Sequence, residues 1–196
     1  MQNKTKIIVI GGIVVAILVA VFLTLSLRKK PQTASLSQKV TLEEKLDSPE
    51  IGLSMGYPKG FTVTNNNSEN FSLQDESNPL VVVNIQKLKK SDANDGFKDI
   101  YTLIAGLKQS FQKVDPNCKF LNETKFIKNQ NQNTQKFPGI GFEVEYNLEN
   151  RQTKYFLATI QKGDNFYVFS LSAPLSDYPN KIGVITSMLG TLNLLN

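Results

Sequence analysis

The feature that most constrains this chain is an uncharged apolar run near its N-terminus. The run begins at Ile7 and ends at Leu27, and only glycine, threonine and serine interrupt its apolar side chains. A bilayer core about 30 Å thick needs about 20 helical residues to cross it, and residues 7–27 supply that length. The sequence therefore predicts one transmembrane helix, which makes the lipid bilayer a binding partner of this chain.

The residues beside this run predict that the helix is retained and that the domain lies outside the cytoplasm. The run is longer than the apolar part of a signal peptide, and the basic residues 28–30 follow it without a convincing cleavage site. Counting positive charges on the two sides gives almost a tie, with a slight lean towards a cytoplasmic C-terminus. Residues 1–6 are short, basic and free of acids, which is typical of a signal-anchor, and long C-terminal domains translocate largely regardless of charge. We therefore expect a single-pass protein of the cell membrane with an extracytoplasmic domain.

The net charge of +5 comes mainly from the flanks of the apolar run. Residues 1–49 hold seven basic and three acidic side chains, which leaves 15 basic and 14 acidic ones for residues 50–196. A nucleic-acid-binding domain needs a basic face on its folded part. The charge distribution therefore argues against nucleic acid as a partner.

The absence of histidine removes most catalytic and metal chemistry. The chain has no histidine and one cysteine, Cys118, so it cannot build a Ser-His-Asp or Cys-His pair or the usual zinc and copper sites. Only carboxylate chemistry or a Ser-Lys pair remains open to an enzyme. We therefore predict no catalytic residue, no metal site and no cofactor.

Beyond the apolar run, the sequence predicts a polar tether and then one domain. Residues 28–49 are polar and are predicted as tether, although 40–46 could form a short helical turn. The domain, residues 50–196, opens with expected strands at 51–57, 61–64, 71–74 and 80–87, of which the last is rich in valine and should be buried on both faces. A helix is expected next, with Asp95 as its cap. Its expected apolar stripe is Phe97, Ile100, Tyr101, Ile104, Leu107 and Phe111.

The sequence of the second half of the domain predicts three more strands and a closing helix. Residues 114–134 are predicted as loop, with a possible strand at 124–128. Strands are expected at 142–147, 155–160 and 166–171, joined by turns at 149–151 and 161–164. The closing helix should start near Asp177, with a stripe made of Ile182, Ile185, Met188, Leu189 and Leu192. This order predicts an α+β fold in which helices pack on a central antiparallel sheet.

Several short motifs resemble the PsbP-like domain family. Residues 57–61 (YPKGF) are similar to the "YPxGW" opening of that family, with Phe61 where members tend to have tryptophan. Residues 139–146, 155–159 and 165–170 resemble its glycine-led strand and hairpin meander, and residues 187–192 its closing helix. The resemblance covers residues 50–195 and implies an α-β-α sandwich.

The function implied by the resemblance is broad. Photosynthetic members are extrinsic subunits of photosystem II, others are assembly factors, and a related nuclear-transport fold binds the GTPase Ran. Many bacterial relatives are anchored extracytoplasmic domains. No ligand or docking residue of the family can be matched here position by position, so the resemblance assigns no site.

Two acidic motifs are candidates for ligand binding. Glu143 and Glu145 lie two residues apart on an expected strand, so both carboxylates project from one face. Such a pair can bind a cation or do acid-base work, but it is also typical of a solvated face paired with Arg151 or Lys154. Residues 92–96 resemble a calcium loop, but the spacing is one residue short and Leu103 stands where a glutamate is needed, so a helix start is favoured.

Two functions remain open on the sequence. The leading hypothesis is a non-enzymatic interaction or assembly module that binds a membrane or envelope protein and exposes an apolar patch on one sheet face. The alternative is a small-molecule or ion-binding domain, or a hydrolase that uses carboxylates such as those at 143 and 145, converging in a concave pocket.

Overall fold

The computed structural model describes residues 40–91, 96–129 and 136–195. The predicted transmembrane run, residues 7–27, lies outside the described residues, as does Asp95. Of the helices within the described ranges, none combines the length and the apolar character needed to span a bilayer.

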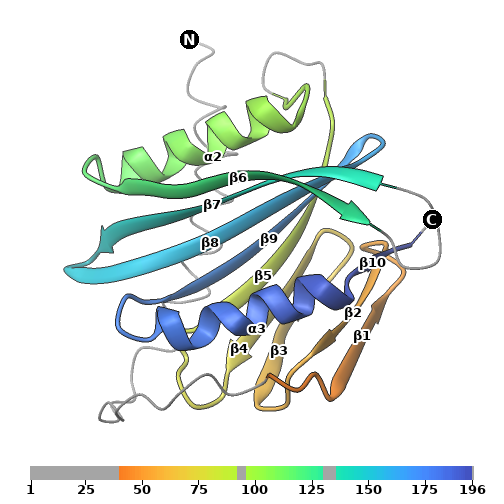
Figure 1. The fold of residues 1–196 in the computed structure, drawn as a ribbon, viewed down its shortest axis with the longest axis horizontal. Coiled ribbons are helices and arrows are strands. Elements are labelled where there is room, and N and C mark those ends of the chain that lie inside the picture. Colours follow the sequence, from red (N-terminus) through yellow and green to blue (C-terminus); the bar gives the residue numbers. More distant parts are fainter. Residues whose placement is uncertain (1–39, 92–95, 130–135, 196) are drawn as a thin grey trace.

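The centre of the fold is a seven-stranded sheet in which every strand is antiparallel to its neighbours. Its order is β3-β4-β5-β9-β8-β7-β6, so that β3 and β6 are the edge strands (Figure 1). The strands are β3 (Phe61–Asn66), β4 (Asn70–Asp75), β5 (Val82–Lys89), β6 (Lys119–Asn129), β7 (Lys136–Leu148), β8 (Arg151–Lys162) and β9 (Asn165–Pro174). β7 and β8 are joined by Glu149 and Asn150, which both have positive φ, as a type I′ hairpin turn requires.

One helix covers each face of this sheet (Figure 1). Alternate residues of β9 show the division, because Phe166 and Val168 pack beneath α2 (Ile100–Val114), whereas Tyr167 and Phe169 belong to the core on the other side. That other core contains α3 (Tyr178–Thr191). The predicted α+β class with an antiparallel sheet between helices is therefore confirmed.

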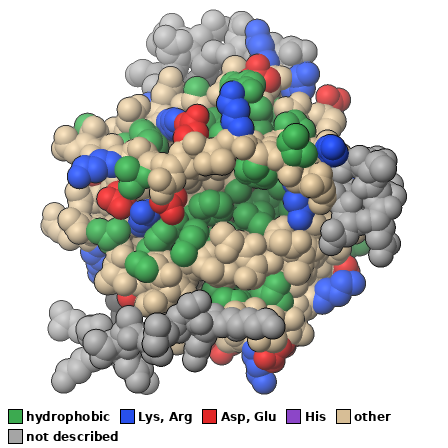
Figure 2. Space-filling view, viewed as in Figure 1, with side chains coloured by type: hydrophobic (Ala, Val, Ile, Leu, Met, Phe, Trp, Pro, Cys, Tyr) green, Lys and Arg blue, Asp and Glu red, His purple; other side chains and the backbone are tan. Residues whose placement is uncertain are grey.

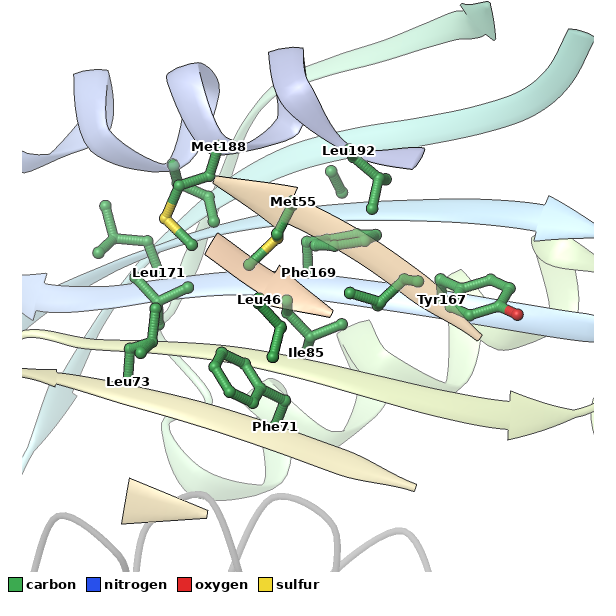
Figure 3. Packing of buried hydrophobic residues seen from close by; sticks show 14 of the residues in the cluster. Leu46, Met55, Phe71, Leu73, Ile85, Tyr167, Phe169, Leu171, Met188 and Leu192 are labelled. Carbon is green, nitrogen blue, oxygen red and sulfur yellow. The ribbon is translucent and has the colours of Figure 1, made fainter. Parts of the chain in front are cut away.

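A second, smaller sheet completes the α3 side. It consists of β1 (Glu44–Ser48), β2 (Leu53–Tyr57) and β10 (Asn193–Leu194), with β2 in the middle. Figure 3 shows how side chains from the small sheet and α3 meet those of β4, β5 and β9. This core is almost entirely apolar, and Leu53, Phe71 and Ile185 are fully buried in it, so it supplies a large share of the hydrophobic stabilisation.

The predicted start of the first long helix is wrong. The helix begins at Ile100, and its cap is Asp99, whose carboxylate accepts a hydrogen bond from the Thr102 backbone while the Thr102 hydroxyl bonds back to the cap. In this capping box the Asp99 backbone N–H donates to the Thr102 hydroxyl in return, and the two hydrogen bonds stabilise the first turn of α2. The predicted stripe is also wrong at Tyr101, because the buried face of α2 runs through Ile100, Leu103 and Ile104 and leaves Tyr101 to one side, where its side chain is 57% exposed.

Two further expectations need correction. The expected loop at 114–134 contains β6, an 11-residue strand that starts five residues before the segment we predicted. The short helical turn expected over 40–46 is wrong, because β1 forms there and pairs with β2. Ordered structure thus extends into the segment predicted as tether. The predicted strands at 142–147, 155–160 and 166–171 are confirmed within β7, β8 and β9.

Candidate functional site: an apolar groove beside the last helix

The candidate site lies on the α3 side of the sheet, where β7 carries unusually small side chains. After Phe137, the residues of β7 that face α3 are Gly139, Gly141, Glu143 and Glu145, and each of these four has a neighbour on β6 and on β8. Gly141 pairs with Ala158 on β8, so two neighbouring positions both lack bulk. The floor of this strand pair is therefore backbone and one methyl group, all of it buried, and two carboxylates follow on the same face of β7.

The ring of Phe126, from edge strand β6, lies across this floor. A Cβ atom added to Gly139 would come within 2.4 Å of the Phe126 ring, a distance that real Cβ atoms do not reach. Glycine at 139 therefore lets the aromatic ring lie directly against the strand, an arrangement known to stabilise sheet glycines. At Gly141 an added Cβ would meet only the carbonyl of Leu157 at 3.3 Å and the Phe126 ring at 3.7 Å, so among the described residues no atom of α3 comes within 4 Å of that point.

The other wall of the groove is the face of α3 that points towards β6. Ile182 and Leu189 lie seven residues apart on this helix, so they share one side of it, and both are only half-buried against the α3-side core. Phe156 of β8 is half-buried in the same way. Figure 2 shows the result as a hollow with an apolar floor near the centre of the molecule, bounded by charged side chains.

The acidic end of the groove contains the two predicted ligand candidates. Glu143 accepts hydrogen bonds from the Tyr178 hydroxyl at 2.6 Å and the Asn122 amide at 2.7 Å, and its carboxylate lies 3.1 Å from the Lys154 ammonium. Lys154 also lies 3.2 Å from the Glu145 carboxylate. The cross-hairpin pairing expected for Lys154 is therefore confirmed, and the cluster holds the start of α3 to the sheet.

The electrostatics of this cluster keep both partners charged. Burial alone would raise the pKa of Glu143, but the hydrogen bonds from Tyr178, Lys154 and Asn122 outweigh it and hold the pKa below its usual value. Burial likewise opposes the charge of Lys154, but the two glutamates raise the pKa of that ammonium overall. A carboxylate that stays ionised and has three donors is a poor proton donor or base at neutral pH. Nor does any group of three or more acidic or sulfur ligands suited to a metal occur within the described ranges.

The opposite end of the groove is basic. Lys128 on β6 donates to the carbonyl of Leu189 at 2.8 Å and to that of Gly190 at 3.3 Å, so it bridges the edge strand and the last turn of α3. Lys162 on β8 donates to the carbonyls of Leu194 and Leu195. Burial lowers the pKa of both lysines. A lysine at the C-terminal end of a helix satisfies its last carbonyls, which explains the position of Lys128, whereas Lys162 bonds to carbonyls that follow α3.

A second concave feature lies beyond the β7–β8 hairpin and is small and polar. It has a volume of about 90 Å³ and is lined in part by Asp115, Asn117 and Asn147. The Asp115 carboxylate already accepts hydrogen bonds from the backbone of Asn117 at 2.9 Å and Asn147 at 2.7 Å. These bonds connect the end of α2 to β7, so the carboxylate has a structural task here, and the apolar groove is the stronger candidate.

Comparison with known proteins supports the fold. No protein-family model matches the chain, and no curated protein matches it. The solution structure of cyanobacterial PsbP (CyanoP) from Synechocystis has a TM-score of 0.52 at 8% identity, covering 84% of this chain and 99% of that one. The fold is PsbP-like. At this identity the likeness describes the architecture and no activity.

Two other solved structures are similar at lower scores. A protein of Bacteroides thetaiotaomicron has a TM-score of 0.49 at 13% identity over 80% of this chain, which spans half of that protein's length. LpqN of Mycobacterium tuberculosis, described as involved in cell envelope biogenesis, has a TM-score of 0.47 at 8% identity, covering 74% of this chain and 83% of LpqN.

The sequence pointed to the acidic end of the groove but not to the groove itself. Glu143 and Glu145 were identified by their spacing, whereas Ile182 and Leu189 were predicted only as part of the apolar stripe of the closing helix and Phe126 had no role assigned to it. The available signal was the Gly-x-Gly spacing at 139 and 141, which places two missing side chains on one face of a strand. Which aromatic ring crosses the gap depends on the β6–β7 register, which the sequence does not reveal.

Proposed function

We propose that this protein is a membrane-anchored, extracytoplasmic and non-enzymatic binding module of PsbP-like type, which takes an apolar segment of a membrane or envelope protein into the groove beside α3. The observation that carries the proposal is the hollow itself, which has an apolar floor (Figure 2), together with the half-buried apolar side chains Phe126, Phe156 and Ile182 beside the glycine positions of β7. Exposed apolar concavities rimmed by polar groups are typical of interaction sites.

The chemistry of the rim supports binding over catalysis. Glu143 is committed to three donors and Lys128 to two carbonyls, so the charged side chains at the ends of the groove position α3. A partner's apolar side chains would enter a site whose walls are already held in place, which lowers the entropic cost of binding. The alternative of a carboxylate-dependent hydrolase finds no favourable geometry here. If a small apolar molecule occupies the groove instead, photo-crosslinking distinguishes it from a protein by the mass of the adduct.

The groove can be tested by site-specific photo-crosslinking in intact membranes. The photoreactive residue p-benzoylphenylalanine at position 126 of the full-length chain should give one discrete protein adduct. Adding Gly141→Val, which fills the floor, or Ile182→Glu, which charges the wall, should remove the adduct. Asn180→Glu is the matched control, since residue 180 is exposed near the start of the same helix and well away in angle from residue 182.

Crosslinking from a second position decides whether an adduct is specific. Val63 is exposed on the opposite edge strand, β3, and p-benzoylphenylalanine there should not give the same product. Identical adducts from positions 63 and 126, or adducts that survive both groove variants, would refute the groove as the binding site. An adduct of small mass, lost in the same two variants, would instead identify a small apolar molecule as the occupant.

The extracytoplasmic location needs its own test with a membrane-impermeant thiol label on intact cells. Cys118 is half-buried, and burial together with the nearby Asp115 raises the pKa of its thiol, so little reactive thiolate forms. Ser68→Cys in a Cys118→Ser background places an exposed thiol in the β3–β4 turn. Labelling of intact cells is expected. Labelling only after lysis would place the domain in the cytoplasm and exclude envelope partners.

A further inference from the structure

The two most exposed large apolar side chains among the described residues lie on a surface other than the groove. Tyr101 is 57% exposed on the first turn of α2, and Ile127 is 62% exposed near the end of β6. Both values exceed those of the other exposed large apolar residues, Val63 at 42% and Val114 at 38%. Scattered exposed apolar residues are ordinary, so what matters is whether these two lie together.

The contacts of β6 place them on one surface. The Lys125 ammonium lies 5.0 Å from the centre of the Tyr101 ring, and Ile127, two residues further along the strand, projects from the same face as Lys125. Pro138 of β7 is directly opposite Ile127 in the register and is exposed. Figure 1 shows the first turn of α2 and the last residues of β6 at the same end of the molecule. We call Tyr101, Lys125, Ile127 and Pro138 the α2–β6 patch.

The charge beside this patch is mainly basic. Lys136 follows the same alternation on β7 as Pro138, and neither Lys125 nor Lys136 forms an ion pair within the described part of the chain. Among the described residues, the nearest acids in sequence are Asp99, whose carboxylate caps α2, and Glu123, which is paired with Lys108. A lysine on an edge strand also discourages pairing with other strands. That role does not account for a tyrosine and an isoleucine exposed beside it.

An anionic bilayer surface fits this combination of side chains. Tyrosine and lysine each have an apolar body and a polar tip, and both favour the membrane–water interface. Each lysine near an anionic surface contributes about 1 kcal/mol, or about fivefold in the docking equilibrium. Two lysines and two apolar side chains would bind weakly from solution, but a chain that is already anchored docks within one molecule, where weak contacts suffice.

We propose that the α2–β6 patch rests on the anionic surface of the membrane to which the chain is anchored, and so orients the domain and its groove. The inference rests on the membrane anchor of the proposed function. Residues 28–39 separate the predicted transmembrane run from the described fold, and 12 extended residues span at most about 40 Å, so the bilayer stays within reach. The chain enters on the α3 side, where Val40 lies near Gly183, and the tether must pass the edge of the sheet for the patch to dock.

The test exploits the absence of tryptophan from the chain. Ile127→Trp in the full-length protein gives a single fluorophore in the patch, and Val63→Trp is the matched control on the opposite edge strand. Both proteins are reconstituted into vesicles of phosphatidylglycerol and phosphatidylcholine whose acyl chains are brominated, because bromine quenches nearby indole fluorescence. We expect a blue shift and strong quenching for the tryptophan at 127, and neither for the one at 63.

Charge reversal and vesicle flotation distinguish a failure of the patch proposal from a failure of the membrane anchor. Lys125→Glu with Lys136→Glu should weaken the docking equilibrium by at least about 25-fold, so that quenching at 127 is largely lost, as it should be in vesicles of phosphatidylcholine alone. If the protein floats with the vesicles but the tryptophan at 127 is not quenched, or is quenched no more than that at 63, the patch proposal is refuted and the anchor stands. If the protein does not float, the anchor itself fails and both proposals fail with it.

Discussion

The two faces of β7 carry opposite kinds of side chain, although they belong to one strand. From residue 139 onwards it presents Ile140, Phe142, Val144 and Tyr146 towards α2, all buried, and two glycines followed by two glutamates towards α3. The α2 face is closed by aromatic contacts, such as those of the Phe111 ring with Tyr146 and Tyr155, each 5.4 Å between centroids. One face of the strand therefore serves stability, and the other leaves room for a site.

The largest loss of stability is expected from a substitution on the α2 face of β7. Phe142→Ala removes a fully buried ring and should lower the free energy of unfolding by about 3–5 kcal/mol, because the cavity it leaves cannot collapse completely. Gly141→Ala, the next residue and on the other face, should change it far less. Urea unfolding of the full-length chain followed by circular dichroism measures both. Similar losses for the two variants would show that the faces are packed alike.

A smaller loss of stability is expected at Gly139, where the Phe126 ring lies against the α3 face of β7. In Gly139→Ala the new methyl group must displace the Phe126 ring, which should cost about 2 kcal/mol in unfolding free energy. The double variant with Phe126→Ala should cost less than the sum of the two single variants, since the clash is then gone. Additive losses would mean that the ring is not seated on Gly139.

The acidic end of the groove should give a pH-dependent effect. Glu143→Gln is expected to cost about 1.5 kcal/mol of stability at pH 7, because the hydrogen bonds to a charged acceptor are weakened. The folded pKa of Glu143 lies below the unfolded value of about 4.3, so its contribution is complete above pH 4.3 and is lost as the pH falls through the folded pKa. The stability difference between the two proteins should thus disappear in acid. A constant difference would show that the carboxylate charge is irrelevant.

The smallest effect concerns glycines that have open space around them. Neither Gly190, in the last turn of α3, nor Gly60 has an atom of the described residues within 4 Å of an added Cβ. Gly190→Ala should stabilise the protein by about 0.5–1 kcal/mol through helix propensity. Gly60→Ala should destabilise it, since its φ of +86° disfavours side chains. Thermal unfolding of both variants checks this, and a loss at Gly190 would indicate that the Lys128 bridge depends on glycine there.

Much of the sheet could be predicted because its strands follow the two-residue alternation closely. In residues 142–147 every second side chain is large and apolar, and this pattern alone identified the strand and its buried face. β6 was predicted only in part, as a possible strand at 124–128, and β1 was missed, since their sequences KFLNETKFIKN and EKLDS are mostly polar. Both are edge strands, which need bury little and whose pairing is decided by their neighbours.

Errors at the first helix show why boundaries are hard to predict. The acidic cluster at 92–96 offered an obvious cap, whereas the cap observed is Asp99, identified only by the threonine three residues later. The exposure of Tyr101 is a separate error, because the buried stripe of α2 runs through Ile100, Leu103 and Ile104 and leaves Tyr101 outside it. The α2–β6 patch depends on that exposure.

The position of β2 between β1 and β10 sets an order of events during synthesis. β2 pairs with a strand that directly precedes it and with another that follows it by about 140 residues, while Leu195 donates its backbone N–H to Gly52. The small sheet, and the seat it gives to α3, cannot close until residue 195 has left the ribosome. Until then, the predicted transmembrane segment is followed by a domain whose small sheet is incomplete. The small sheet is therefore the last part of the described fold to close, and α3, which forms one wall of the groove, packs on an incomplete core until then.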